Sequence, residues 1–561
     1  MEERIKRNNG DKRSRSSSRN RTSRNNKKYT SDNDNTNNTS SYNNNNNRDN
    51  PFDNYDEFDD ILDIDDNLAD DEDDTILERR QFPNVDFDEI PKNKLKGQTL
   101  LYLTSVFVSL GVFIFGYDQG YMSGVIVNTI FEKYYNHPSS IEIGTVVAVL
   151  EIGALIASLF LGKISNKIGR KRTIIIGAFL FIIGGFIQSL SPTLLCLGAG
   201  RLVSGFGIGF LSGIVPVYQS EISPSEARGR MGCIEFTGNI LGYSSSIWID
   251  YGCSFFKGDI SFRMPIITQC ILGGFLFIGG FFIVESPRWL LEKDKDQEGF
   301  HVLNLLYSDS GELNKAKEEF LSIKRQVINE KFGNDVSFEN ARNSQVIKTN
   351  YFTIIKRHKY RIFIGCSALF WAQFNGINLI SYYAPLVFEQ AGFKGRTALL
   401  VTGINSLIYL ASTIPTWFLV DKWGRRPILI TGGIWMGIAL ILISFFMYQS
   451  KSYTSLAVAI LVIFYNSGFG YSWGPIPWLY ANEIYSDSTV RGVGAALATA
   501  VNWFSNFVVG EGSPILLEVI TWRLYAIYGI ICLLSSFFAY KFYPETSGVE
   551  LEDMDKLFDK E

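Results

Sequence analysis

Residues 162–172 read GKISNKIGRKR, a short basic loop between two long apolar runs, and residues 421–426 read DKWGRR in the same setting. Arg170 and Arg425 occupy the same place in the two loops and are separated by 255 residues. This repetition indicates that the chain contains two related halves, each built around one such loop.

Two further pairs of landmarks have nearly the same separation. Glu221 and Glu483 each end an apolar run and are 262 residues apart. Glu285 and Glu545 lie in polar segments that follow later runs, and they are 260 residues apart. Three pairs at almost one offset are hard to obtain by chance. They predict two similar halves that face each other across a central cavity.

The repeat is embedded in apolar runs long enough to cross a bilayer. About 30 Å of hydrocarbon requires about 20 residues of helix, and backbone amides in lipid must be satisfied within the segment. We therefore predict an all-α membrane protein with twelve transmembrane helices in two six-helix halves. The expected spans are 99–119, 141–163, 173–190, 194–217, 231–250, 265–284, 361–383, 398–420, 428–448, 455–481, 493–512 and 523–543.

Charge is concentrated outside these runs. Residues 1–97 hold 17 basic and 23 acidic side chains and few apolar ones. We predict a disordered tail over 1–95, six-helix bundles over 98–284 and 361–544, a linker with amphipathic helices over 285–360, and a short tail over 545–561.

Basic residues in short loops predict the orientation of the spans. The loops around Arg170 and Arg425 are rich in Lys and Arg, whereas residues 189–195 contain neither. Both termini and the linker are therefore expected in the cytoplasm. The residues near Met1 contain no apolar segment of the kind found in a signal peptide, so we expect no cleaved signal peptide.

Several short motifs resemble the sugar porter family of the major facilitator superfamily, over residues 98–560. The motifs are FGYDQG at 115–120, PVYQSE at 216–221, ESPRW at 285–289, GPIPW at 474–478 and YPET at 543–546. YDQG at 117–120 and EFTGN at 235–239 look most like fungal members. The resemblance implies the major facilitator fold and alternating-access transport of a sugar, or of a polyol or cyclitol.

Asp118 and Arg201 are a buried acid and a buried arginine in the first and fourth spans. A carboxylate in lipid is costly unless it is paired, hydrated or protonated. The resemblance implies that the two residues form a proton-coupling pair. A permanent structural ion pair is the alternative, and it would fit a facilitator without proton coupling.

Neutral amides and aromatic rings in apolar spans suit a carbohydrate, whose hydroxyls need hydrogen bonds and whose C–H faces pack on rings. The positions that resemble the family's substrate site are Gln373, Asn378, Asn405, Trp478 and Asn502, and Tyr382 is a further candidate that supplies aromatic surface. For any single amide, helix–helix association is the alternative. Ala372 and Phe236 stand where hexose binders usually have Gln, so a polyol such as myo-inositol competes with glucose.

The repeated loop motifs resemble the family's cytoplasmic gate. The resemblance implies ion pairs of Arg170 with Glu221 and of Arg425 with Glu483, with Arg228 and Arg491 in the same clusters. Asn166 replaces the usual Asp of the first loop. A solvated charge cluster that sets only topology is the alternative.

We found no nucleophile–base pair, phosphate loop, dinucleotide fingerprint or metal cluster, and we predict neither an enzyme nor a bound cofactor or metal. The expected partners are a small sugar or polyol, protons and lipid, without nucleic acid. We expect a monomeric proton symporter of the plasma membrane. The first alternative is a facilitator. The second, which the sequence favours less, is a sugar sensor that signals through a tail.

Overall fold

The structure is a computed structural model that describes residues 85–87, 96–223, 228–307, 313–332, 351–449, 454–485, 488–549 and 554–558. These residues form helices joined by short connections, and none of them lies in a β-strand. The predicted disordered tail falls outside the described residues, apart from 85–87.

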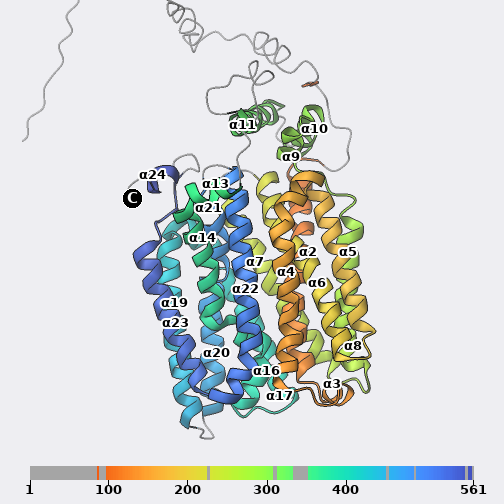
Figure 1. The fold of residues 1–561 in the computed structure, drawn as a ribbon, viewed down its shortest axis with the longest axis vertical. Coiled ribbons are helices and arrows are strands. Elements are labelled where there is room, and N and C mark those ends of the chain that lie inside the picture. The colour runs from red at the N-terminus through yellow and green to blue at the C-terminus, as the bar shows by residue number, and fades with distance from the viewer. Residues whose placement is uncertain are drawn as a thin grey trace, which may run out of the picture. The chain divides into compact units, whose positions relative to one another are not determined.

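Six long helices form the first half, and each overlaps a span predicted from the sequence. Helices α4 and α5 both pack against α6, and α2 packs against α7 (Figure 1). The six are α2 (Gly97–Ile126), α4 (Ser140–Ile168), α5 (Arg170–Ser189), α6 (Leu194–Ile222), α7 (Arg228–Cys253) and α8 (Ile260–Gly279).

The second half contains six spans, three of which are interrupted. The unbroken helices are α19 (Arg425–Gln449), α22 (Ser488–Ile520) and α23 (Arg523–Phe542). The broken spans are α14 (Lys359–Ala372) with η4 (Gln373–Ile377) and α15 (Asn378–Tyr382), α17 (Arg396–Thr413) with α18 (Thr416–Trp423), and α20 (Thr454–Tyr471) with α21 (Pro475–Glu483).

Eleven spans in the described part of the chain are long and apolar enough to cross a membrane by themselves. The other predicted span, α7, is more polar because it faces the second half. Its Thr237 hydroxyl donates to the Thr413 hydroxyl at 2.9 Å and accepts from the Trp417 indole at 2.9 Å. Thr237 of α7 therefore lies between helices rather than in lipid.

Many large apolar side chains are exposed on the outer faces of the long helices. Leu195 is 86% exposed and Val106 is 73% exposed, and Phe160, Phe186 and Tyr540 are each more than half exposed. Water-soluble proteins rarely carry such extensive apolar surface, whereas lipid requires it. Burial and exposure thus agree with a bundle surrounded by hydrocarbon.

The seventh span bends at η4, a π-helical turn between α14 and α15. Gly376 has φ 92°, a left-handed conformation that favours glycine. The carbonyl of Asn375, next to the break, accepts from the Tyr465 hydroxyl at 2.9 Å. The freed backbone group is thus satisfied by a neighbouring helix, and the bend exposes polar groups beside it.

Three further helices lie together at one end of the bundle, which we call the α9–α11 end (Figure 1). They are α9 (Pro287–Glu292), α10 (Asp296–Tyr307) and α11 (Leu313–Phe332), and α3 (Thr129–Tyr134) lies near the opposite end, the α3 end. Their small core contains Phe300 and Phe320, and Val85 and Phe87 from the amino-terminal segment pack into it.

Lys324 joins α11 to the α9–α10 turn. Its ammonium donates to Asp294 at 3.2 Å and to Asp296 at 2.6 Å, and Lys331 also pairs with Asp294 at 3.2 Å. Partial burial opposes ionisation of Asp294, but the two lysines outweigh it and hold the pKa of this carboxyl below its usual value.

We expect Asp294→Asn to lower thermal stability at neutral pH by less than about 1 kcal/mol, the scale of exposed ion pairs. Asparagine suits the backbone there, where φ is 56°. A lowered pKa stabilises the fold above the ordinary aspartate value of about 3.9, and this contribution is lost as pH falls through the lower folded value. Melting curves in detergent should therefore converge in acid. A difference that widens in acid would contradict this assignment.

Candidate functional site

A small cavity lies between the two halves, with side chains of both halves in its lining. The lining combines neutral polar groups with aromatic rings. Its residues are Phe115, Gln119, Phe236, Asn239, Ile240, Tyr243, Ala372, Gln373, Ile377, Asn378, Ser381, Tyr409, Phe469, Trp473, Gly474 and Trp478.

Helix α7 provides one wall of this cavity. Phe236, Asn239, Ile240 and Tyr243 recur at positions i, i+3, i+4 and i+7, which lie on one face of a helix. We did not predict Asn239 or Tyr243 as site residues, although this spacing could have indicated them. Ala372 and Phe236, the two departures from the hexose pattern, both line the cavity and make it less polar.

The bend of the seventh span presents two of the predicted amides to the cavity. Asn378 donates from Nδ2 to Gln373 Oε1 at 2.6 Å, and Gln373 donates from Nε2 to Asn502 Oδ1 at 2.7 Å. Gln373 and Asn378 line the cavity, as does Trp478, whereas Asn502 lies behind them on α22. The chain of bonds orients the amides before any ligand enters.

Two other predicted binding residues lie outside the cavity lining. Asn405 on α17 is fully buried and accepts from the Asn466 amide on α20 at 3.1 Å, a contact within the second half. Tyr382 at the end of α15 donates to Glu151 at 2.7 Å, across the boundary between the halves. Neither residue lines the cavity, although the Tyr382 hydroxyl accepts from the cavity residue Gln119 at 3.2 Å.

Asp118 and Arg201 form the predicted ion pair. Arg201 Nη2 lies 3.4 Å from Asp118 Oδ2, and each side chain is only 1% exposed. The guanidinium also donates to the Tyr121 hydroxyl and to the Val147 carbonyl, both at 3.0 Å. Asp118 immediately precedes the cavity residue Gln119 on α2 but is not itself among the residues that line the cavity.

Glu151 on α4 is a further buried acid that our sequence reasoning missed. Its side chain is fully buried, and Oε1 accepts from Tyr382. The signal was available, because an ionisable residue inside a transmembrane segment is by default a candidate for function. Glu235, which we had noted, is buried on α7 beside the cavity residue Phe236.

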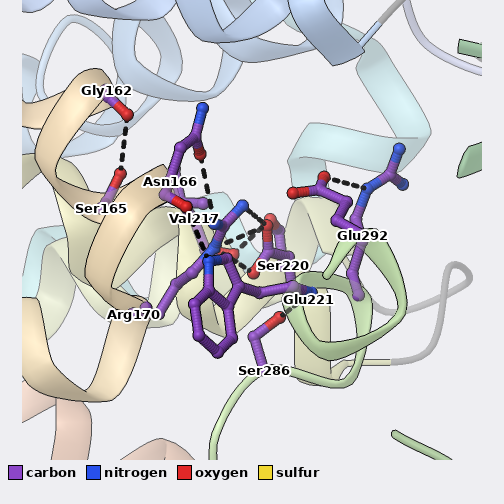
Figure 2. Close-up of polar contacts among 12 residues, drawn as sticks. Gly162, Ser165, Asn166, Arg170, Val217, Ser220, Glu221, Ser286 and Glu292 are labelled. Atoms are coloured by element: carbon purple, nitrogen blue, oxygen red, sulfur yellow. Dashed lines mark hydrogen bonds and ion pairs between the residues drawn. The ribbon is translucent and has the colours of Figure 1, made fainter. Parts of the chain in front are cut away.

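Arg170 begins α5 and joins three segments at the α9–α11 end. Its Nη2 lies 2.7 Å from Glu221 Oε1 and its Nε 2.9 Å from Oε2, a two-pronged ion pair with α6. Nη1 donates to Asn166 Oδ1 at 3.2 Å, as Figure 2 shows. The neutral Asn166 thus keeps a hydrogen bond to the arginine but supplies no charge.

The second half repeats this cluster with an additional acid. Arg425 pairs with Glu483 at 2.8 Å through Nη2 and at 3.0 Å through Nε, and with Asp421 at 3.3 Å. Each arginine therefore binds an acid of its own half rather than of the other half. The structure contains the ion pairs of both predicted gate clusters. The cluster around Arg425 carries more negative charge than the cluster around Arg170.

The remaining two predicted gate arginines are Arg491 and Arg228. Arg491 donates to the Tyr485 carbonyl at 2.9 Å. The side chain of Arg228 lies outside the described part of the structure, although its backbone belongs to α7.

Glu285 and Glu545, which the sequence offered only as landmarks, bind helix N-termini. Glu285 Oε1 accepts from the backbone N–H of Arg170 at 2.9 Å and of Lys171 at 3.1 Å, at the start of α5. Glu545 accepts from Arg425 at 2.8 Å and from Arg426 at 3.0 Å, at the start of α19. Carboxylates at these positions satisfy the unpaired N–H groups and the positive end of the helix dipole.

Comparison with known proteins agrees with this architecture. The model of the family "Sugar (and other) transporter" matches residues 104–558. The MFS-type transporter criB of Aspergillus cristatus is 33% identical over 471 residues, covering 82% of this chain and 94% of criB. A high-affinity glucose transporter of Kluyveromyces lactis is 31% identical over 482 residues, covering 82% of this chain and 85% of that protein.

Among solved structures, the proton:xylose symporter XylE from E. coli is similar, with a TM-score of 0.69 and 26% sequence identity. The match covers 82% of this chain and 98% of that structure. XylE is a protein of the major facilitator superfamily. Family match, relatives and helical arrangement lead to one conclusion: the chain belongs to the sugar (and other) transporter family, and it is a multi-pass membrane transporter with the major facilitator fold.

Proposed function

We propose that the protein is a proton-coupled symporter that carries a neutral sugar or polyol through the central cavity. The observation that carries this proposal is the combination, in one helical bundle, of a buried ion pair, Asp118 with Arg201, and a cavity lined by amides and aromatic rings. Such a cavity has hydrogen-bond partners for hydroxyls and flat surfaces for C–H faces.

The lining also bears on the substrate class. Gln373 and Asn378 are uncharged, which suits a neutral ligand, and Trp478 adds an indole surface. Ala372 and Phe236 leave fewer polar contacts than a hexose site of the usual kind. We therefore propose a hexose or a more flexible polyol or cyclitol as the substrate.

The geometry supports alternating access in the following way. The halves meet at the cavity, and each half keeps its own arginine–glutamate cluster at the α9–α11 end. Rocking of one half against the other would expose the cavity first to one side and then to the other. Asp118 would take up a proton with the substrate and release it on the opposite side, while Arg201 favours its ionised form.

We further propose that the α9–α11 end lies in the cytoplasm, with both chain termini on that side, and that the membrane is the plasma membrane. The basic loops that begin α5 and α19 support this orientation. We propose a monomer, because one chain contains both walls of the cavity.

The decisive experiment is uptake of labelled hexoses, pentoses, glycerol and inositol by purified protein in liposomes, with external pH followed during uptake. A symporter accumulates one of these substrates against its gradient and alkalinises the medium as the substrate enters. Absence of uptake for every substrate would instead favour a sensor.

A facilitator is the second candidate, and one observation favours it. Arg201 donates its two Nη hydrogen bonds to neutral groups, Tyr121 and the Val147 carbonyl, as a structural brace would. Equilibration of substrate without accumulation and without a change in pH would establish this alternative.

We expect Gln373→Ala and Asn378→Ala each to weaken the apparent affinity for the transported substrate by about tenfold, the equivalent of one hydrogen bond of about 1.4 kcal/mol. Both amides line the cavity, and each change also breaks the bond that orients the other. The measurement is the concentration dependence of uptake.

Asn466→Ala is the matched control, because this buried amide lies in the same half but outside the cavity lining. Its apparent affinity should match that of the wild type, even if less protein is recovered. Unchanged affinity in both cavity variants, with correctly inserted protein, would remove Gln373 and Asn378 from the site.

A further inference from the structure

Glu151 is a fully buried carboxylate for which the transport scheme above has no role. It lies on α4, in the first half, and its Oε1 accepts from the Tyr382 hydroxyl at 2.7 Å. Its Oε2 is buried and has no hydrogen-bond partner in the part of the chain that the structure describes. A half-satisfied buried carboxylate is costly, which points to a function rather than to stability.

The partner of Glu151 connects the two halves of the protein. The Tyr382 hydroxyl also accepts from the Gln119 amide at 3.2 Å and lies 3.3 Å from Asn506 Oδ1. Gln119 and Glu151 belong to the first half, whereas Tyr382 and Asn506 belong to the second. Any rearrangement that separates α4 from α15 must therefore break the Glu151–Tyr382 hydrogen bond.

The surroundings of Glu151 include the proposed proton site. In the described structure, the charged and titratable groups that act on it are Arg201 from α6, Asp118 from α2 and Tyr382 from α15, and it acts in turn on Tyr383. Helix α22 contributes the neutral Asn506 at this point. Arg201 lies 3.4 Å from Asp118 and donates to the carbonyl of Val147, one helical turn before Glu151 on α4, so one guanidinium acts on both carboxylates.

We propose that Glu151 is a positioning residue that transmits the proton occupancy of Asp118 to the contact between the halves at Tyr382. This inference rests on the proposed symport. Two like charges that share one cation favour a state with a single proton. In the loaded state one proton occupies the pair, on Asp118 or on Glu151. It leaves the pair for the opposite side of the membrane when the substrate is released, so that both acids are then ionised.

The two proton positions have different consequences for Tyr382. With the proton on Asp118, Glu151 is ionised and accepts a charge-assisted O–H···O⁻ bond, which is roughly twice as strong as a neutral one. The halves are then held together at Tyr382. With the proton on Glu151, that bond is weaker, and α4 and α15 separate more readily. Proton loading of Asp118 thereby closes the protein around its substrate.

The test is the pH profile of substrate exchange in liposomes with equal pH on both sides. If Glu151 had only a structural role, its replacement would not shift this profile. Glu151→Gln removes the competing negative charge, so protonation of Asp118 requires more acid. We expect the pH of half-maximal exchange to fall by about one unit. Tyr382→Phe deprives ionised Glu151 of its donor and should shift the profile in the same direction.

Glu511→Gln is the matched control. Glu511 on α22 accepts from the Thr145 hydroxyl of α4 at 2.8 Å, so it also joins the halves, but it is not among the groups that act on Glu151. Its profile should equal that of the wild type.

Wild-type profiles in both Glu151→Gln and Tyr382→Phe would overturn the proposal. If Glu151→Gln does not insert, the profile of Tyr382→Phe decides alone. Failure of the proposed symport has a separate signature, since wild-type protein would then not accumulate substrate, whatever the variants do.

Discussion

Asp118→Asn is expected to abolish accumulation of substrate against a gradient and to leave exchange of substrate across the membrane intact. The amide has nearly the shape of the carboxylate but cannot alternate between a charged and a neutral form. Net transport requires release of the proton and return of the empty protein, whereas exchange requires only movement with substrate bound. The measurement is accumulation by energised vesicles, with counterflow exchange in the same preparation.

Arg201→Ala should impair accumulation as well, because it removes the cation that favours ionised Asp118. Asp250→Asn is the control: it neutralises another buried acid of the first half, which lies against Gly124 on α2 rather than beside Arg201. This control should still accumulate substrate. Full accumulation by Asp118→Asn would assign the ion pair a structural role and leave the facilitator interpretation in place.

Gly116→Ala is expected to prevent assembly of α2 with α7 and to give little folded protein. A Cβ atom at Gly116 would overlap the backbone carbonyl of Asn239. Backbone of a packed helix cannot move aside as a flexible side chain can, so the helices would have to separate. Overpacking typically lowers the free energy of unfolding by about 1–3 kcal/mol. For a clash with backbone we expect a loss at or above the upper end of this range.

The measurement is the yield of monodisperse protein in detergent, together with its melting temperature. Gly238→Ala is the matched control on the same interface, because its Cβ would lie 3.9 Å from the nearest atom, the Ser109 carbonyl oxygen. This variant should behave as the wild type. Equal yield and melting temperature for Gly116→Ala would show that the two helices are less closely packed than the structure indicates.

Apolar run length and the internal repeat predicted the fold, because lipid permits almost no other solution for such a chain. A backbone in hydrocarbon must bond to itself, so a long apolar run becomes a helix whatever its neighbours. The repeat around Arg170 and Arg425 predicted two similar halves, and the resemblance to the sugar porter family implied their ion pairs with Glu221 and Glu483, which the structure contains. The same repeat contained Glu285 and Glu545, but their contacts with helix N-termini required coordinates.

The candidate site was only partly predictable. Gln373 and Asn405 are both amides in apolar helices, and the sequence does not distinguish them. In the structure, Gln373 lines the cavity, whereas Asn405 binds Asn466. A water-soluble helix reveals its buried face through its apolar stripe, but in a membrane both lipid and protein interior are apolar, and that signal is weak.

The sequence by itself determined the number of spans, the two related halves and the presence of buried charges and amides in them. Only the tertiary structure decided which of these groups meet. Glu151 and Tyr382 are 231 residues apart, and their hydrogen bond depends on how α4 packs against the second half. Helix formation in lipid is a local property of each segment, whereas the partner of a buried polar group is set by packing between segments distant in sequence.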